Sequence, residues 1–169
     1  IDMSDEASLE NATNCLVLAS ILGISRDVLG IKSRALKPIS MRLEMKEGLR
    51  GNTLIDDSYN NDVDGLRLAL PLLQKNKQKK SVLILSDFIE TGIDEDTLYK
   101  QIAQLIAHQR IEKIIGIGSQ IERNKHYFQE IDTYATAETL VDSGDLNSLH
   151  DSIILLKGAR KYAFEKIVN

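Results

Sequence analysis

The sequence predicts an α/β protein: a Rossmann-like, mostly parallel sheet with helices on both faces, preceded by a short helical segment. The main observation is that apolar runs of strand length alternate with segments of helical periodicity, joined by short connections. A second observation is a proline-containing stretch that separates an earlier helical pattern from this alternation. We therefore expect a helical segment at residues 1–36, a linker at 37–40 and an α/β domain at 41–169.

Composition narrows the class of protein. The chain has 169 residues, 43% of them hydrophobic and 27% charged, with a net charge of −4. A packed core is therefore expected, and an acidic balance argues against a nucleic-acid partner. The single cysteine excludes an internal disulfide and a zinc site built from cysteine pairs, which fits a reducing cytoplasm. No apolar run is long enough for a membrane span. The chain does not begin with methionine, so we expect a piece of a longer protein.

The first segment is expected to form two helices. Apolar residues recur at helical spacing at Leu9, Ala12, Leu16, Ala19 and Leu22. Residues 15–22 are apolar almost all round, which predicts a buried helix with Cys15 in its core. Gly23 can end this helix, and Ser25 can cap a second helix over 26–33.

The elements after the linker follow in order. "MRLEMKE" and "TLIDDS" predict two strands, which the turn "GLRGN" can join into a hairpin. Three later apolar runs predict buried strands, "SVLILSD", "EKIIGIGS" and "SIILLKG". Helices are expected from Val63 to Leu73, around 98–106, at 120–128 and at 137–141, and "YAFEKIV" predicts a final helix.

Polar clusters follow several of the predicted strands. In parallel sheets, ligands bind beyond the carboxyl ends of the strands. The clusters at those ends are Asp56–Asn61, Ser86–Gly92, Gly116–Gln120 and Lys157–Arg160. Their shared position predicts one binding site at this edge of the sheet.

Each cluster also has a simpler explanation. Asp56 and Asp57 could bind a ribose hydroxyl or a metal, or Asp57 or Ser58 could cap the next helix. Asp87 and Glu90 could act as an acid–base pair, or they could belong to an ordinary loop.

The later two clusters also allow either a binding role or a structural one. "GIGS" at 116–119 lacks the third glycine of a dinucleotide-binding turn, so close packing of strand and helix explains it better. Lys157, Arg160 and Lys161 suit a phosphate or carboxylate partner, or a surface cluster paired with acidic neighbours.

Taken together, these segments resemble the Mur ligase family. The resemblance runs through nearly the whole chain, in "ENATNCLVLAS", "RLE", "IDDSYNND", "LSDFIETG", "IGIGSQI" and "LLKGARKYAFEKI". "DDSYN" is most similar to the members that add D-alanyl-D-alanine to UDP-N-acetylmuramoyl-tripeptide. The chain departs from the family pattern at Ser86, where glycine is usual, at residues 61–63, and at Ala159, where serine is usual.

The resemblance implies a function for the longer protein. It implies an ATP-dependent ligase of peptidoglycan precursor synthesis that works through an acyl phosphate. ATP and Mg²⁺ would be bound mainly by a central ATPase domain, of which residues 1–36 would be the last helices. No catalytic residue and no metal ligand is expected in this chain, which should be inactive alone. Its partners would be the tripeptide precursor, D-alanyl-D-alanine and the protein's own N-terminal and central domains.

The resemblance also implies roles for matching residues. The ATP-binding positions are Asn11, Asn14, Arg42 and Asp57. The positions that line the cleft for the dipeptide are Tyr59, Asn60, Lys157 and Arg160. In the family, the asparagines lie near the adenine, the arginine at the phosphates and the aspartate at the ribose.

Three further expectations stand beside this reading. "SDFIETG" and "FEKI" resemble the Bacteroidetes version, in which an alanine racemase follows the ligase; pyridoxal phosphate would be a cofactor only then. One alternative is another Mur-type ligase, such as a folylpolyglutamate synthetase. The other is a non-catalytic Rossmann-like binding domain, because the chain has no complete phosphate-binding loop.

Overall fold

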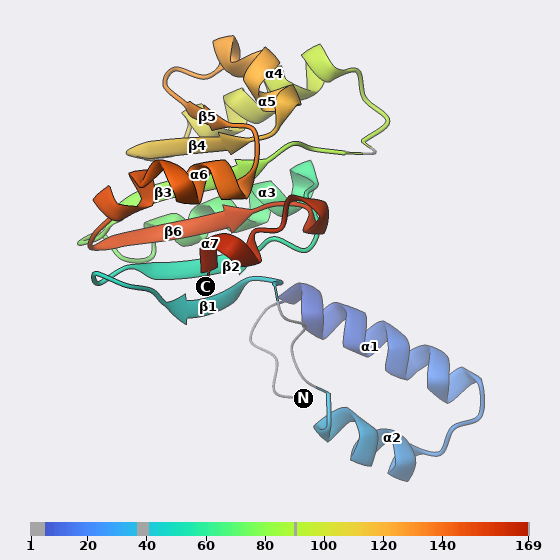
Figure 1. The fold of residues 1–169 in the computed structure, drawn as a ribbon. Helices are drawn as coiled ribbons and strands as arrows, with labels where there is room; N and C mark the ends of the chain where they lie inside the picture. The colour runs from blue at the N-terminus through green and yellow to red at the C-terminus, as the bar shows by residue number, and fades with distance from the viewer. Residues whose placement is uncertain (1–5, 37–40, 90, 169) are drawn as a thin grey trace. The chain divides into compact units, whose positions relative to one another are not determined.

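The computed structural model describes residues 6–36, 41–89 and 91–168 (Figure 1). The predicted linker at 37–40 lies outside the described residues. The chain divides into two compact units, residues 1–40 and residues 41–169. None of the helices in the described ranges has the length and apolar character needed to cross a membrane.

The first unit contains two helices, α1 (Glu6–Ile21) and α2 (Arg26–Arg34). Gly23 ends α1 with a φ of 87°, which glycine adopts without strain. Its N–H donates to the Ser20 carbonyl at 3.0 Å, so the last turn keeps its hydrogen bonds. Ser25 caps α2 by accepting a hydrogen bond from the Val28 N–H. Both helices and the cap are therefore as predicted.

The prediction that residues 15–22 form a buried helix is wrong for the described chain. Cys15 is exposed. The apolar residues around it are exposed as well, namely Val17, Leu18, Ile21 and Leu22. Within the described part of this unit α1 packs against α2. One nine-residue helix covers only one side of α1, so the segment from Cys15 onward, which is apolar almost all round, stays largely exposed.

The second unit is built on a six-stranded sheet with the order β1-β2-β6-β3-β4-β5. The strands are β1 (Glu44–Glu47), β2 (Thr53–Asp57), β3 (Lys80–Ser86), β4 (Lys113–Ile117), β5 (Asp132–Tyr134) and β6 (Ser152–Lys157). β1 runs antiparallel to β2, and every other pairing is parallel. This arrangement confirms the predicted hairpin and the mostly parallel sheet.

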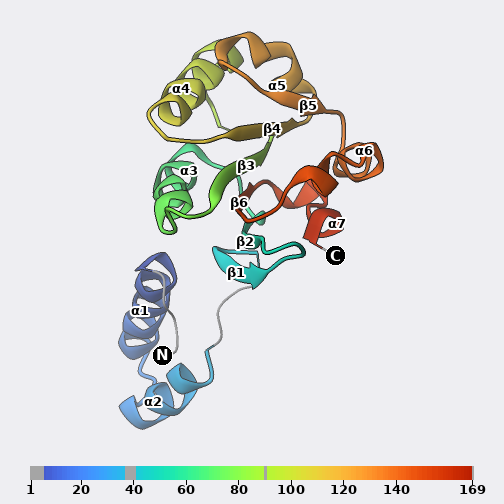
Figure 2. The ribbon, with the colours of Figure 1, turned by 90° about the vertical axis from the view of Figure 1, so that its left-hand side faces the viewer.

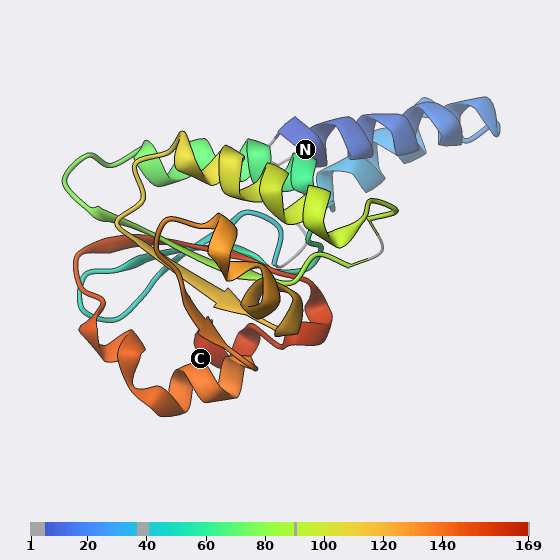
Figure 3. The same cartoon turned by 90° about the horizontal axis from the view of Figure 1, so that it is seen from above.

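Helices cover both faces of this sheet (Figures 2 and 3). Helices α3 (Val63–Ala69), α4 (Glu95–Ala107) and α5 (Ser119–Asn124) pack on one face. Helices α6 (Ala137–Ser143) and α7 (Glu165–Val168) pack on the other. The described residues of this unit also form 3₁₀ helices at Leu70–Gln74, Lys125–Tyr127, Asp145–Ser148 and Arg160–Tyr162.

Strand β3 shows how the sheet divides the core. Leu83 and Leu85 face the α3–α4–α5 side, while Val82 and Ile84 face the α6–α7 side. Successive side chains on a strand point to opposite faces, so a strand covered on both sides must be apolar at every position. The continuous apolar run predicted a buried strand for this reason, and the structure confirms it.

Two predicted elements are shorter than expected because of left-handed backbone positions. "MRLEMKE" becomes a strand only from Glu44, since Met41 and Leu43 have φ values of 66° and 50°. "YAFEKIV" becomes helical only at 165–168, since Ala163 has a φ of 51°. Non-glycine residues rarely adopt this conformation, and it interrupts regular structure.

Candidate functional site

The polar clusters predicted at the strand ends meet at one edge of the sheet. The Asn61 Nδ2 donates to the Ser86 carbonyl at 2.8 Å, which joins the ends of β2 and β3. The Ala159 N–H donates to the Ser86 Oγ at 3.0 Å, which adds the end of β6. Asp87 accepts from the Ile121 N–H at 2.8 Å, which adds the start of α5 after β4. The structure thus confirms that the clusters lie together.

The adjacent aspartates at the end of β2 have different partners. The Asp57 Oδ2 lies 2.9 Å from the Lys157 Nζ, on the neighbouring strand β6. The Lys157 Nζ also donates to the Asn60 carbonyl at 2.7 Å. Asp56 instead pairs with Lys46 of β1 at 3.1 Å. Neighbouring residues of a strand point to opposite faces, so the two carboxylates belong to separate networks.

Burial sets the protonation behaviour of Asp57. Its side chain is 13% exposed, and burial raises the pKa of its carboxyl group because water no longer solvates the charge. The charge of Lys157 and its hydrogen bond lower that pKa, but the net effect is a raised value. Lys157 is 2% exposed, so its ammonium is enclosed by protein and is not on the surface of a cleft.

The helix cap after β2 is Asp62, not Asp57 or Ser58. The Asp62 side chain accepts from the Gly65 N–H at 2.7 Å and starts α3. The capping explanation for the earlier residues is therefore wrong, and Asp57 is available for another role. Ser58 instead donates its hydroxyl to Asp56 at 2.6 Å.

Two predicted site residues on different segments meet at Tyr59. The Arg42 guanidinium lies 5.1 Å from the centre of the Tyr59 ring, and the Arg160 guanidinium lies 5.8 Å from it. A hydrogen bond from the Tyr59 N–H to the Met41 carbonyl holds the first segment in place, and one from the Arg160 N–H to the Tyr59 carbonyl holds the second. In the described parts of the chain neither guanidinium has a carboxylate partner within ion-pair distance.

This Arg42–Tyr59–Arg160 group has the character of an anion-binding surface. Tyr59 is 38% exposed, and Arg160 is exposed beside it. Guanidinium groups bind phosphate and carboxylate through paired N–H donors and stack on aromatic faces. The side chain of Asn60 is exposed next to them. Of the predicted dipeptide positions, three are therefore surface residues and Lys157 is not.

Asp87 is a structural acceptor at the centre of this edge. It accepts from the Gln120 N–H at 3.1 Å and from the Tyr162 hydroxyl at 2.9 Å, in addition to Ile121. The Tyr99 hydroxyl lies 3.4 Å from it. Asp87 is 2% exposed, so the structure favours the loop explanation over acid–base chemistry. Glu90, its predicted carboxylate partner, lies outside the described residues.

Close packing explains the "GIGS" segment. A Cβ added at Gly118, which has a φ of 125°, would lie 2.3 Å from the Asp87 Oδ2. A Cβ added at Gly116 would lie 2.2 Å from the Ile121 side chain of α5. The two glycines let a carboxylate and a helix approach the end of β4, as predicted.

Asn11 and Asn14 belong to the other unit. Both are exposed on α1 and lie three residues apart, so they share one face of the helix.

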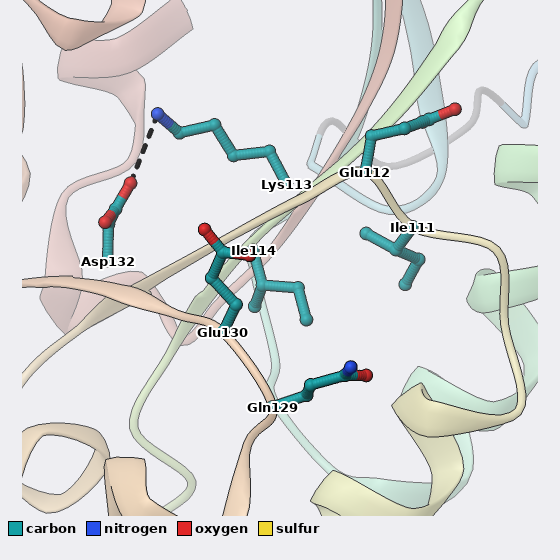
Figure 4. Close-up of a pocket in the computed structure, with 7 residues that line it drawn as sticks. All are labelled: Ile111, Glu112, Lys113, Ile114, Gln129, Glu130 and Asp132. Carbon is teal, nitrogen blue, oxygen red and sulfur yellow. Dashed lines mark ion pairs between the residues drawn. The ribbon is translucent and has the colours of Figure 1, made fainter.

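A separate hollow lies at the opposite edge of the sheet, near the first residues of β4 and β5 (Figure 4). Its volume is about 310 Å³, and its lining includes Glu112, Glu130 and Asp132. The only cation drawn there, Lys113, pairs with Asp132 at 3.2 Å. Within the described ranges no three His, Cys, Asp or Glu side chains are placed to hold a metal ion. This hollow therefore lacks the free cations found around Tyr59.

Sequence reasoning missed two residues of the site. Tyr99 and Tyr162 both direct their hydroxyls to Asp87, and burial raises the pKa of each, with the nearby carboxylate adding to the effect. Tyr162 follows the polar cluster at 157–160 by two residues, which was the only signal available. Tyr99 lies on α4, and nothing in its spacing distinguishes it from a core residue.

Comparison with known proteins gives this geometry a context. No family model matches the chain. "UDP-N-acetylmuramoyl-tripeptide--D-alanyl-D-alanine ligase" of Bacillus subtilis is 26% identical over 165 residues, which cover 94% of this chain and 36% of that protein. The Escherichia coli protein of the same name is 23% identical and covers 95% of this chain and 36% of its own length. The chain thus spans about a third of these relatives.

Solved structures agree on the fold. MurF from Acinetobacter baumannii matches 99% of this chain and 37% of its own, with a TM-score of 0.71 and 19% identity. The chain matches the C-terminal domain of these ligases. A folylpolyglutamate synthase from Thermotoga maritima has the same fold at a TM-score of 0.57 and 15% identity, with 41% of that chain covered. The fold is therefore shared with the MurF ligases and with a wider set of enzymes.

Proposed function

We propose that the chain is the C-terminal substrate-binding domain of a cytoplasmic, ATP-dependent ligase that adds D-alanyl-D-alanine to UDP-N-acetylmuramoyl-tripeptide. The observation that carries this proposal is the Arg42–Tyr59–Arg160 group, whose tyrosine follows the end of β2 that carries Asp57. Two cations that have no carboxylate partner among the described residues suit a reaction whose substrates are anionic. The names of the two ligase relatives supply the reaction.

The two units support a division of the parent protein. We assign residues 1–36 to the end of a central ATPase domain, 37–40 to a linker and 41–169 to the C-terminal domain. The exposed apolar side chains of α1 and α2 support the first assignment, because such a surface is normally covered by further protein.

The chemistry follows from the proposed reaction. ATP phosphorylates the carboxylate of the tripeptide to give an acyl phosphate, the amine of the dipeptide attacks the acyl carbon, and phosphate leaves. Arg42 and Arg160 would stabilise the negative charge of the phosphate oxygens and the dipeptide carboxylate. Mg²⁺ would neutralise the ATP phosphates from the central domain, since the described residues of this chain provide no carboxylate cluster to hold it.

The remaining residues have proposed roles in the same site. Asp57 would accept hydrogen bonds from the ribose, and Asn11 and Asn14 would lie near the adenine. Tyr59 and Asn60 would line the cleft for the dipeptide. The enclosed position of Lys157 favours an indirect role over contact with the dipeptide.

The test is phosphate release by the parent chain with ATP, magnesium and a UDP-muramoyl-tripeptide, with and without D-alanyl-D-alanine. Release that depends on the dipeptide is expected. If dipeptide-dependent release is absent whichever amino acid stands at the third position of the tripeptide, the ligase proposal is wrong. If nucleotide binds to the parent chain and stabilises it, but no amino acid or dipeptide stimulates ATP hydrolysis, the non-catalytic binding domain is favoured. If the enzyme adds glutamate to a folate, the folylpolyglutamate synthetase is favoured.

Asp57 can be tested separately in the parent enzyme. Asp57→Ala should raise the apparent KM for ATP about tenfold or more, because a hydrogen bond to a charged group contributes about 1.5–3 kcal/mol. An unchanged KM for ATP removes Asp57 from the ribose role.

Neither relative's name includes a racemase, so the fused racemase and its pyridoxal phosphate stay predictions that sequencing beyond Asn169 can test.

A further inference from the structure

Lys157 has no room for a ligand beside its ammonium group. Its Nζ lies 2.9 Å from the Asp57 Oδ2 and 2.7 Å from the Asn60 carbonyl oxygen. On the α3 side, a Cβ added at Gly65 would lie 2.9 Å from the same Nζ. An ammonium has three donors; protein groups take two of them, and the side chain is only 3% exposed. A cation held in this way acts on its protein neighbours and not on a bound molecule.

We propose that Lys157 is a positioning residue that holds the Asp57 carboxylate ionised and fixed at the end of β2, for a ligand that Lys157 itself does not touch. The register of the sheet supports this role. Asp57 and Lys157 are directly paired residues of the parallel strands β2 and β6. The ion pair therefore joins two paired strands, and the carboxylate cannot change its position without breaking the contact with Lys157. The identity of the ligand as a nucleotide ribose rests on the proposed function.

The charges around Asp57 leave Lys157 as the group that opposes protonation. The groups that face Asp57 are Lys157 from β6, Asp62 from the start of α3, and the N–H of Leu43 from the segment before β1. Burial and the like charge of Asp62 favour the protonated acid, while Lys157 and the Leu43 N–H favour the carboxylate. Lys46, on the neighbouring strand β1, pairs with Asp56 on the opposite face.

The direct test is the titration of Asp57 in this chain, followed by carboxyl carbon NMR. Lys157→Met and Lys157→Gln both remove the charge, and either one suffices if the other does not fold. The pKa of Asp57 should rise by about one to three pH units, which is the usual effect of losing an opposite charge at this distance. Lys157→Arg keeps the charge and should keep the pKa near its wild-type value.

Lys46→Met is the matched control, because it removes a lysine from the neighbouring aspartate. It should leave the titration of Asp57 close to that of the wild type. An unchanged Asp57 pKa in a folded neutral variant of Lys157 overturns the proposal. So does a Lys157→Arg variant that titrates like Lys157→Met, because the charge would then not be the cause.

A second measurement connects this role to the ligand. In the parent enzyme, the KM for ATP should rise more steeply toward low pH in Lys157→Met than in the wild type, because Asp57 becomes protonated in this range. The ratio of the two KM values should grow as the pH falls, by up to one decade for each pH unit by which the pKa of Asp57 is raised. Lys157→Arg should restore the wild-type profile, which a purely structural role would not require.

The two measurements separate the two hypotheses. If Asp57 titrates as expected and the KM profile follows it, both the positioning role and the nucleotide site are supported. If the titration shifts but the KM for ATP is independent of pH, Asp57 does not bind the nucleotide, and Lys157 does not position it for that ligand. If the titration does not shift, the positioning role is wrong whatever the ligase does.

Discussion

At the scale of single residues, neighbouring aspartates of one strand have different surroundings. Asp56 pairs with Lys46. Burial is the largest single influence on the pKa of Lys46 and lowers it, but the hydrogen bonds that Lys46 donates to Asp56 and Glu44, together with the charges of these carboxylates, raise the pKa overall. Asp57 pairs with Lys157 on the α3 side and is slightly more exposed, at 13% of its side chain against 3% for Asp56. The order of residues in "DDSYN" predicts that these groups lie together at a strand end. It does not predict the pairing, because the facing strand β6 lies about 100 residues away and its register is set by the whole core.

The Asp57–Lys157 pair gives a prediction about stability. Asp57→Asn or Lys157→Met alone should each lower the free energy of unfolding by about 3 kcal/mol, because each leaves a buried group without its partner. The double variant should lose clearly less than the sum of the two, as urea unfolding of this chain can measure. Additive losses would show that the two side chains do not depend on each other. Lys46→Met, which affects a half-exposed lysine, should cost less than Lys157→Met.

The tyrosines on Asp87 predict a weakness at high pH. Burial raises the pKa of Tyr162 above its ordinary value of 10.0, and the hydrogen bond to Asp87 adds to this. A raised pKa in the folded state means that the unfolded chain loses its proton first. The resulting stability is complete below about pH 10 and is lost as the pH rises further, by about 1.4 kcal/mol per pH unit for each such group.

Tyr162→Phe isolates this contribution. The free energy of unfolding should fall less steeply above about pH 10 in the variant than in the wild type, because the variant has one fewer group that titrates on unfolding. Urea unfolding at a series of pH values gives the two slopes. Equal slopes would mean that the Tyr162 hydroxyl does not bond to Asp87 in solution. Tyr99→Phe should act in the same direction, since the pKa of Tyr99 is also raised, by burial first and by Asp87 second.

At the scale of elements, the start of α5 depends on one glycine. Gly118 has a φ of 125°, and any side chain there meets the carboxylate that caps the helix. Gly118→Ala should therefore lower the free energy of unfolding by about 2 kcal/mol or more, from backbone strain and from loss of the contacts to Asp87. Gly92→Ala is the control, because it has a φ of 67° and open space around it. Equal losses in the two variants would show that contact with Asp87 contributes nothing.

The predicted elements that fail do so for identifiable physical reasons. Apolar periodicity predicts β3, β6 and α4 well, because burial on one or both faces fixes their sequences. The left-handed residues Met41 and Leu43 carry no such signal, since non-glycine residues adopt this conformation only where contacts elsewhere require it. The meeting of Arg42 with Tyr59 depends on this turn. It could not be derived from a sequence in which the two residues are 17 positions apart.

At the scale of the whole molecule, the chain lacks parts that the proposed reaction needs. It contains no glycine-rich loop ending in lysine and serine or threonine. The 169-residue chain alone should therefore show no ATP turnover that depends on D-alanyl-D-alanine. The measurement is phosphate release by the purified chain, compared with the parent enzyme at equal concentration. Dipeptide-dependent turnover by the chain alone would place catalysis within these residues.

The apolar surface of the first unit gives a second prediction at this scale. The side chains of Leu18, Ile21 and Ile31 are 58%, 76% and 70% exposed. The isolated chain should self-associate as its concentration rises, because exposed apolar patches attract one another. Leu18→Gln with Ile21→Gln should reduce this in sedimentation velocity. Leu49→Gln replaces an exposed leucine of the β1–β2 turn and should not reduce the self-association. Equal association in all three proteins would show that α1 is not the contact surface.

The strand order also has a consequence for how the molecule folds. β6 is the last of the six strands of this sheet in chain order, yet it lies between β2 and β3. β2 and β3 therefore cannot take their final places until β6, which lies about 100 residues after β2, inserts between them. Closing so long a loop is slow compared with forming the β1–β2 hairpin. We expect the Asp57–Lys157 pair to form late, so that a nascent chain acquires its binding edge only after β6 has been synthesised.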